Sequence, residues 1–95
     1  MQKILAELDG SNYPKCEQDL GRVIRELVNS HPDKKEISVN ISGISHQNAI
    51  SFGYSHAFGH QSFLFPIRDS SETITGWTLQ LVKYQLQEQR SMQPL

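Results

Sequence analysis

Cysteine is almost absent from this chain of 95 residues. The single thiol, Cys16, has no second cysteine with which to form an internal disulfide, and such a composition is typical of a reducing compartment. No apolar run is long enough for a transmembrane helix, and the first ten residues lack the apolar stretch of a signal peptide. We therefore expect a cytoplasmic protein with no membrane partner.

Neither sign of charge is in excess, because nine Lys and Arg stand against ten Asp and Glu, for a formal net charge of −1. Proteins that bind duplex DNA or anionic membranes draw much of their affinity from a basic excess, which is missing here. The chain length suits one domain with one small core. We expect a single domain over residues 1–88 and a flexible, glutamine-rich tail over residues 89–95.

Catalytic motifs are absent as well. Ser42-Gly43 and Ser51-Phe52-Gly53 are serine–glycine pairs, but the chain has neither a GxSxG nucleophile motif nor a phosphate-binding glycine loop. The sequence therefore predicts no catalytic residue and no cofactor.

What the chain does have is a regular pattern between residues 50 and 67. Large side chains occupy the even positions from Ile50 to Phe58 and small ones the odd positions, and a period of two is typical of a strand. Gly59-His60 then predicts a two-residue turn into a second strand. The resulting register would place aromatic residues of both strands on one face, through the pairs His56–Phe63, Tyr54–Phe65 and Phe52–Ile67.

The other segments are simpler. Residues 2–8 alternate and favour a strand over a helix, while residues 15–30 follow Pro14 and carry an apolar stripe at helical spacing. Gly21 inside that helix indicates close packing. Residues 36–42 and 73–82 read as further strands. With a four-residue loop at 69–72, Ile74 would lie opposite Ile67, and Trp77 and Leu79 would share a face with Leu64.

These segments predict an α+β two-layer sandwich, with one main helix packed on the aromatic face of an antiparallel β-meander of four strands and residues 2–8 as an optional fifth. Residues 42–59 also resemble the strand-then-helix core of STAS-like domains, with Ser42-Gly43 after a strand and Phe58-Gly59 at the end. This resemblance covers under a quarter of the chain and implies a helix where the alternation indicates a strand. The alternation extends over all nine residues, and we therefore expect a strand.

Three histidines, His46, His56 and His60, lie within fifteen residues. On a strand, however, residues four apart are separated by about 13 Å, too far to share a metal, so no metal site is predicted. We expect His56 to be a neutral histidine on the apolar face and His60 an exposed turn residue. Cys16 at a helix start would need a base such as His46 or His56 to act as a nucleophile.

The small residues of the 50–58 segment predict a partner-binding surface, because they allow another backbone to approach closely. Trp77 would be its anchor, since Trp is enriched at binding hot spots. The alternative is that the chain's own C-terminal segment, through Val82 and Leu86, covers this surface. The predicted partner-binding residues are Ser51, Gly53, Ser55, Leu64, Trp77 and Leu79.

The function predicted first is that of a small non-enzymatic interaction module, a homodimeric inhibitor or adaptor that occupies a partner's surface, for example a phage-type anti-defence factor. The second is a small-molecule, metal-binding or catalytic module that uses His46, His56, His60 and Cys16. The third is an RNA-binding or single-stranded DNA-binding module, which ranks last because the aromatics that would stack on bases are expected in the core.

Overall fold

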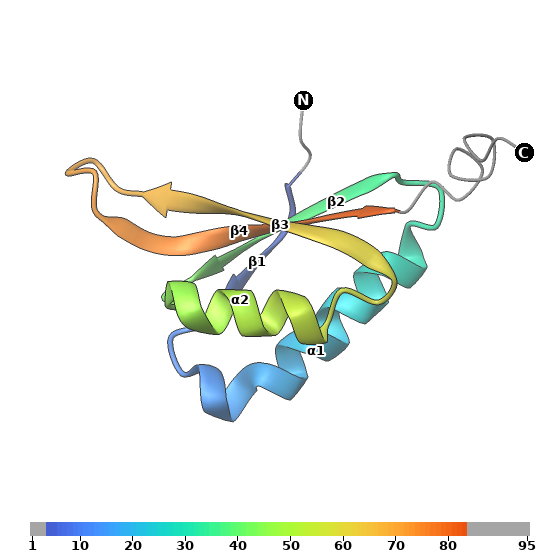
Figure 1. Ribbon diagram of the computed structural model, residues 1–95, viewed down its shortest axis with the longest axis horizontal. Coiled ribbons are helices and arrows are strands. Elements are labelled where there is room, and N and C mark those ends of the chain that lie inside the picture. Colours follow the sequence, from blue (N-terminus) through green and yellow to red (C-terminus); the bar gives the residue numbers. More distant parts are fainter. Residues whose placement is uncertain (1–3, 84–95) are drawn as a thin grey trace, which may run out of the picture.

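The computed structural model describes residues 4–83 and shows a four-stranded sheet with two helices on one of its faces (Figure 1). The strand order is β1-β2-β4-β3, so β1 and β3 are the edge strands. β1 and β2 are parallel, whereas β2–β4 and β3–β4 are antiparallel. In chain order the elements are β1 (Ile4–Asp9), α1 (Tyr13–Ser30), β2 (Glu36–Ser42), α2 (His46–Ser55), β3 (His60–Arg68) and β4 (Ile74–Lys83).

The α+β class and most of the elements agree with the sequence-based prediction. The strand favoured for residues 2–8 is β1, the helix expected at 15–30 is α1, and the strand expected at 36–42 is β2. The two later strands are also present, as β3 and β4. The tail predicted for residues 89–95 lies outside the described residues, as does Leu86.

The expected antiparallel meander is wrong, because the sheet is mixed. Helix α1 connects β1 to β2, and a helical crossover is how the chain joins two parallel neighbours. β2 then pairs on its other side with β4, through Val39 opposite Leu79 and Ile41 opposite Trp77. The segment 50–58 has no place in this sheet.

That segment is helix α2, so the predicted strand over 50–58 is wrong. The hydroxyl of Ser45 caps the helix by accepting the Asn48 N–H at 3.1 Å. Ala49, Phe52 and Gly53, spaced three and four apart, are the buried residues of α2, which is helical spacing. The helix implied by the strand-then-helix resemblance is therefore present.

The predicted hairpin at Gly59-His60 is absent for the same reason. Phe58 and Gly59 have positive φ angles, of 52° and 84°, and connect the end of α2 to β3. His60 is the first residue of β3, and β3 pairs with β4 instead of residues 50–58. The cross-strand pairs expected for His56, Tyr54 and Phe52 therefore do not form.

The core lies between the two helices and the sheet. A Cβ on Gly53 would lie 3.2 Å from Cδ1 of Leu79, so the missing side chain is what allows α2 to sit directly on β4. The buried apolar cluster comprises Leu20 and Ile24 of α1, Ala49 and Phe52 of α2, Ile44, and the strand residues Val39, Ile41, Leu79 and Leu81.

The helices cover the aliphatic face of the sheet and leave the aromatic face open, the reverse of the expectation. Leu64 pairs with Leu79 on the covered face, and Phe63 and Phe65 on the opposite face are each 44% exposed. The β3–β4 register differs from the predicted one by two residues, since Ile67 pairs with Gly76 and not with Ile74. A shift of two keeps every side chain on its predicted face, so Trp77, Leu79 and Leu64 do share one.

Candidate functional site

The outer edge of β3 is one of the two sheet edges, with that of β1, at which the described structure leaves backbone groups free to pair. β3 is an edge strand, and the N–H of His60 bonds to the Ala57 carbonyl at 3.0 Å, away from β4. Opposite His60, the Lys83 N–H bonds to the Lys35 carbonyl at 3.0 Å, toward β2. The His60–Lys83 pair is therefore not hydrogen-bonded, and the even-numbered residues of β3 point their backbone groups outward.

This alternation leaves the N–H groups of Ser62 and Leu64 on the outer edge of the sheet. The next outward position is Pro66, which has no N–H to offer and so costs the β3–β4 ladder nothing. The edge thus presents two adjacent donor positions, bounded by Pro66 on one side and by His60, whose N–H is already bonded, on the other.

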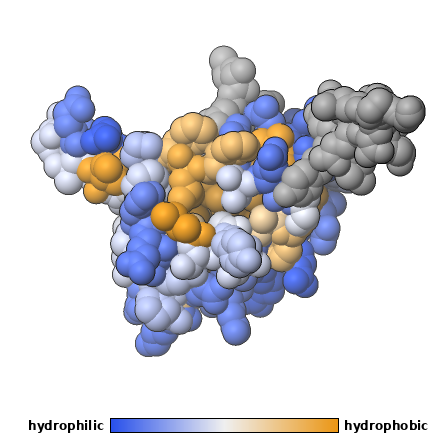
Figure 2. Space-filling model, viewed as in Figure 1, coloured by the Kyte–Doolittle hydropathy of each residue, from blue (hydrophilic) through white to orange (hydrophobic). Residues whose placement is uncertain are grey.

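Apolar side chains flank this edge on both faces of the sheet. Phe63 and Phe65 project from the open face, and Leu64 lies on the helix side. Beside Leu64, the α2 residues Ile50 and Tyr54 are 51% and 89% exposed. Figure 2 shows apolar surface gathered above α2, at the level of the sheet. A shallow groove of about 280 Å³ runs between α2 and β3, lined by Ala49, Ile50, Gly53, Tyr54, Ser62 and Leu64.

The rest of the open face is polar and acidic. Asn40 donates to the carboxylate of Glu7 at 3.1 Å and accepts from the Thr78 hydroxyl at 2.6 Å. One step along the strands, the Gln80 amide donates to Glu36 at 3.2 Å. By register, none of the open-face positions before the β3–β4 bulge at Ile67 is Lys or Arg. This part of the face therefore carries carboxylates on β1 and β2, aromatics on β3 and no cation to attract phosphate.

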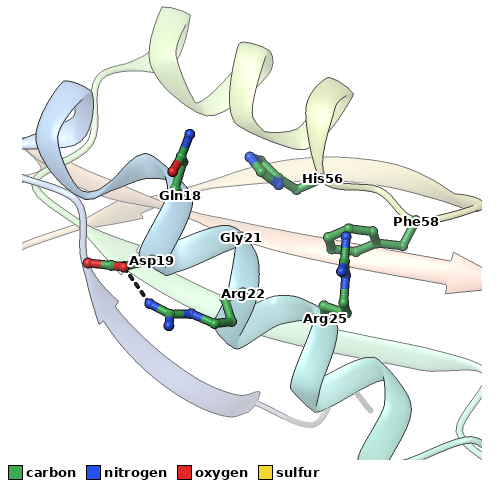
Figure 3. Close-up of a pocket in the computed structure, with 7 residues that line it drawn as sticks. All are labelled: Gln18, Asp19, Gly21, Arg22, Arg25, His56 and Phe58. Atoms are coloured by element: carbon green, nitrogen blue, oxygen red, sulfur yellow. Dashed lines mark hydrogen bonds and ion pairs between the residues drawn. The ribbon is translucent and has the colours of Figure 1, made fainter.

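A second groove, of about 440 Å³, lies between α1 and the end of α2, and Figure 3 shows its lining. His56 reaches across it, and its Nε2 pairs with the Glu17 carboxylate. A Cβ on Gly21 would lie closer than 3.0 Å to Nδ1 and Cε1 of the same ring, which also packs at a tilt against Phe52 with centroids 4.6 Å apart. Through Glu17 and the space beside Gly21, the His56 ring fastens α2 to α1.

The two arginines of this groove also have partners. Arg22 forms an ion pair with Asp19, and the Arg25 guanidinium lies 5.1 Å from the ring centroid of Phe58 (Figure 3). The close packing expected at Gly21 is confirmed. The expectation that His56 would lie on an aromatic strand face is wrong, since the residue caps the C-terminus of α2.

The remaining candidates for metal binding or catalysis each have a different neighbour. His46 stacks on Trp77 with centroids 4.4 Å apart, and Nδ1–H of His60 donates to the carbonyls of Ala57 and Phe58 at 3.1 Å. The Cys16 thiol donates to the Asp9 carbonyl at 3.7 Å. Within residues 4–83, no three His, Cys, Asp or Glu side chains gather as metal ligands would.

The six residues predicted to bind a partner do not form one surface. Gly53 and Leu79 are buried against each other, with Leu64 beside them, because α2 itself covers this strip. Trp77 is half-buried under His46, while Ser51 and Ser55 are exposed on α2. Neither another chain nor the C-terminal segment is needed to cover Gly53.

The apolar residues around the β3 edge were not among the predicted partner-binding residues; they are Ile50, Tyr54, Phe63 and Phe65. One signal was available, because a proline within an apolar strand marks an edge strand, and Pro66 lies in the middle of HQSFLFPIR.

Fold and site together define a small α+β protein in which apolar side chains flank the incompletely paired edge of β3. Comparisons with protein-family models, with curated proteins and with solved structures find no match to the chain. Over the part of the chain that the structure describes, no helix is long and apolar enough to cross a membrane.

Proposed function

We propose that this protein is an interaction module that binds another polypeptide by adding a strand to the outer edge of β3. The observation that carries the proposal is the pair of outward N–H groups of Ser62 and Leu64, set between exposed apolar side chains. In strand addition the main chain supplies hydrogen bonds, and side chains on alternate faces supply specificity. An inhibitor or adaptor, including an anti-defence factor of a phage, would act by occupying a partner in this way.

The apolar flanks of the edge give a bound strand more than hydrogen bonds. Phe63 on one face and Leu64 on the other would both lose water on binding, and aromatic residues supply much of the energy of protein interfaces. Left unpaired, such an edge is a site of uncontrolled association. Pro66 limits that risk, because it ends the run of outward N–H groups.

Binding of single-stranded nucleic acid is the other candidate, since exposed Phe63 and Phe65 on an open sheet face could stack on bases. The charge of the face argues against it. Glu7 and Glu36 lie on the same face, and none of its positions before the bulge at Ile67 is Lys or Arg, so the phosphate backbone would be repelled there. A protein partner is the better fit.

The test uses peptides selected from a phage-displayed library of random linear sequences, with the intact protein as bait. Ser62→Pro removes one outward N–H and leaves the bonds between β3 and β4 in place. We expect this variant to bind the selected peptides about tenfold more weakly or worse, because the lost bond leaves a peptide carbonyl unpaired, at a cost of about 1–3 kcal/mol.

Ile74→Lys is the matched control. Ile74 is 42% exposed, about as much as Phe63, but it lies on β4 near the hairpin turn and away from the outer edge. This control should bind like the wild type. The proposal fails if Ser62→Pro, shown to be folded by circular dichroism, keeps full affinity, or if Ile74→Lys loses as much as Ser62→Pro does.

A further inference from the structure

We infer that the strand added to this edge is β3 of a second copy of the chain, antiparallel to the first and related to it by a two-fold axis at Phe63. The inference rests on the proposed function and names its partner. It predicts a homodimer whose two sheets join into one, an isologous contact in which each copy presents the same surface.

In this register the free hydrogen-bonding groups of Ser62 and Leu64 on one copy meet complementary groups on the other. With the axis at Phe63, Ser62 lies opposite Leu64 of the second copy, and Leu64 lies opposite Ser62 of the second copy. Each of these pairs exchanges two N–H to C=O bonds, so both free donor positions are satisfied. Just beyond them, His60, whose N–H is already bonded, lies opposite Pro66, which has none.

Neighbouring two-fold registers interrupt the bonds nearer the axis. With the axis at Ser62, the carbonyl of Leu64 would face the His60 N–H, which is already bonded to Ala57. With the axis at Leu64, the carbonyl of Ser62 would face Pro66, which has no N–H. The register centred on Phe63 keeps the two pairs beside its axis fully bonded. The carbonyls that face no donor are then those of His60 and Pro66, at the two ends of the joint, where water can reach them more easily.

The side chains that meet in this register are compatible. Phe63 would lie beside Phe63 of the second copy in a non-hydrogen-bonded pair, where side chains approach most closely, and Phe65 would lie opposite Gln61. Ser62 would lie opposite Leu64 on the helix side. None of these residues is ionised, so no like charges meet across the axis, and a net charge of −1 per chain opposes association only weakly.

The position of α2 supports the same arrangement. α2 packs against both β3 and β4, so its axis lies between the two strands. With strands about 4.8 Å apart, the two α2 helices of a dimer would be about 10 Å apart, which is the spacing of packed helices. Ile50 and Tyr54, the large exposed residues of α2, would then lie near that contact.

A charge exchange at residue 63 tests the inference, because only a two-fold axis at Phe63 brings this residue against itself. Phe63→Lys and Phe63→Glu each place two like charges side by side, and we expect each variant to raise the dimer dissociation constant about tenfold or more. An equimolar mixture of the two variants should form a heterodimer, because opposite charges then meet. Analytical ultracentrifugation measures all three samples, and Ile74→Lys is again the control.

The inference is overturned if the wild type sediments as a monomer up to its solubility limit, if both single variants remain dimers, or if their mixture stays monomeric. None of these results removes the proposed function, which depends on selected peptides and on Ser62→Pro. A dimer that Ser62→Pro leaves intact would also overturn the inference, whereas the proposed function fails only on its peptide measurements. Circular dichroism of each variant serves as the control that the substitution has not unfolded the chain.

Discussion

Gly21 in the middle of α1 offers a test of the contact between α1 and α2. The test asks whether Gly21→Ala raises or lowers the free energy of unfolding. Replacing a mid-helix glycine with alanine ordinarily stabilises a helix by about 1 kcal/mol. Here the new methyl group would lie closer than 3.0 Å to the ring of His56, which must then leave its place. The substitution therefore sets a gain in helix propensity against the loss of the His56 contacts.

The loss should be the larger of the two. Moving the ring breaks the pairing of His56 with Glu17, which contributes about 1 kcal/mol net, and its tilted contact with Phe52, which contributes about 1 kcal/mol more. With some rotamer strain added, Gly21→Ala should lower the free energy of unfolding by about 1–2 kcal/mol. In a His56→Ala background no ring is displaced, and the same substitution should raise it by about 1 kcal/mol.

Urea unfolding followed by far-UV circular dichroism, at one fixed protein concentration, gives the four free energies of this double-mutant cycle. The account predicts opposite signs for Gly21→Ala in the two backgrounds and a coupling energy of about 2–3 kcal/mol. If Gly21→Ala stabilises the protein equally in both, His56 does not fasten α2 to α1, and the description of this groove is wrong.

Two further predictions concern the ends of elements. Ser45→Ala removes the hydroxyl that accepts the Asn48 N–H and should lower the free energy of unfolding by about 1 kcal/mol, whereas Ser45→Asp should retain most of it; equal urea midpoints would contradict the cap. The second prediction is that the stability of the turn between β3 and β4 depends on pH through Asp69. The Ser71 hydroxyl and the N–H groups of Thr73 and Ser71 hold the pKa of the Asp69 carboxyl below the ordinary value. A lowered pKa in the folded state means that the stabilisation is complete above about pH 4 and is lost as pH falls through the lowered pKa. The amide resonances of Ser71 and Thr73 should shift with that titration, and a midpoint at or above the ordinary value would contradict it.

The parts of the fold that the sequence predicted correctly are those where only one periodicity fits. Residues 36–42 alternate without interruption and have no helical alternative, and α1 is long enough for its apolar stripe to repeat. Strand β3 was also found, although it was paired with the wrong neighbour, because its aromatics suited a turn at Gly59-His60 as well as they suit the turn before β4.

Helix α2 was predicted as a strand because residues four apart lie on the same face in both structures. A sequence in which such residues are alike therefore fits either one. Phe52 and His56 are both large, and Gly53 and Ala57 are both small, so each pair fits a strand face and a helix row equally well. The spacing of three between Ala49 and Phe52 decides for the helix. The cap formed by Ser45 with Asn48 was a further local signal.

The sequence alone also does not show which face of the sheet the helices leave uncovered. Two helices on one side of a sheet can cover only one of its faces, and both faces of β3 carry large apolar side chains, Leu64 on one and Phe63 on the other. The rows of Val39 and Ile41 on β2 and of Leu79 and Leu81 on β4 form the continuous aliphatic surface that the helices cover. Because β2 pairs with β4, β3 lies at the edge of the sheet, and its Phe63 and Phe65 lie on the face without helices.

The most direct test of the central claim is amide hydrogen exchange at the outer edge of β3, measured by NMR as protein concentration increases. The account predicts that the N–H groups of Ser62 and Leu64 exchange quickly in dilute solution and slow down as copies associate. The N–H groups of Phe63 and Phe65, which point toward β4, should be protected at every concentration. Exchange at Ser62 and Leu64 that is already slow in dilute solution, or that stays fast at every concentration and with every selected peptide, would contradict the claim that another strand binds there.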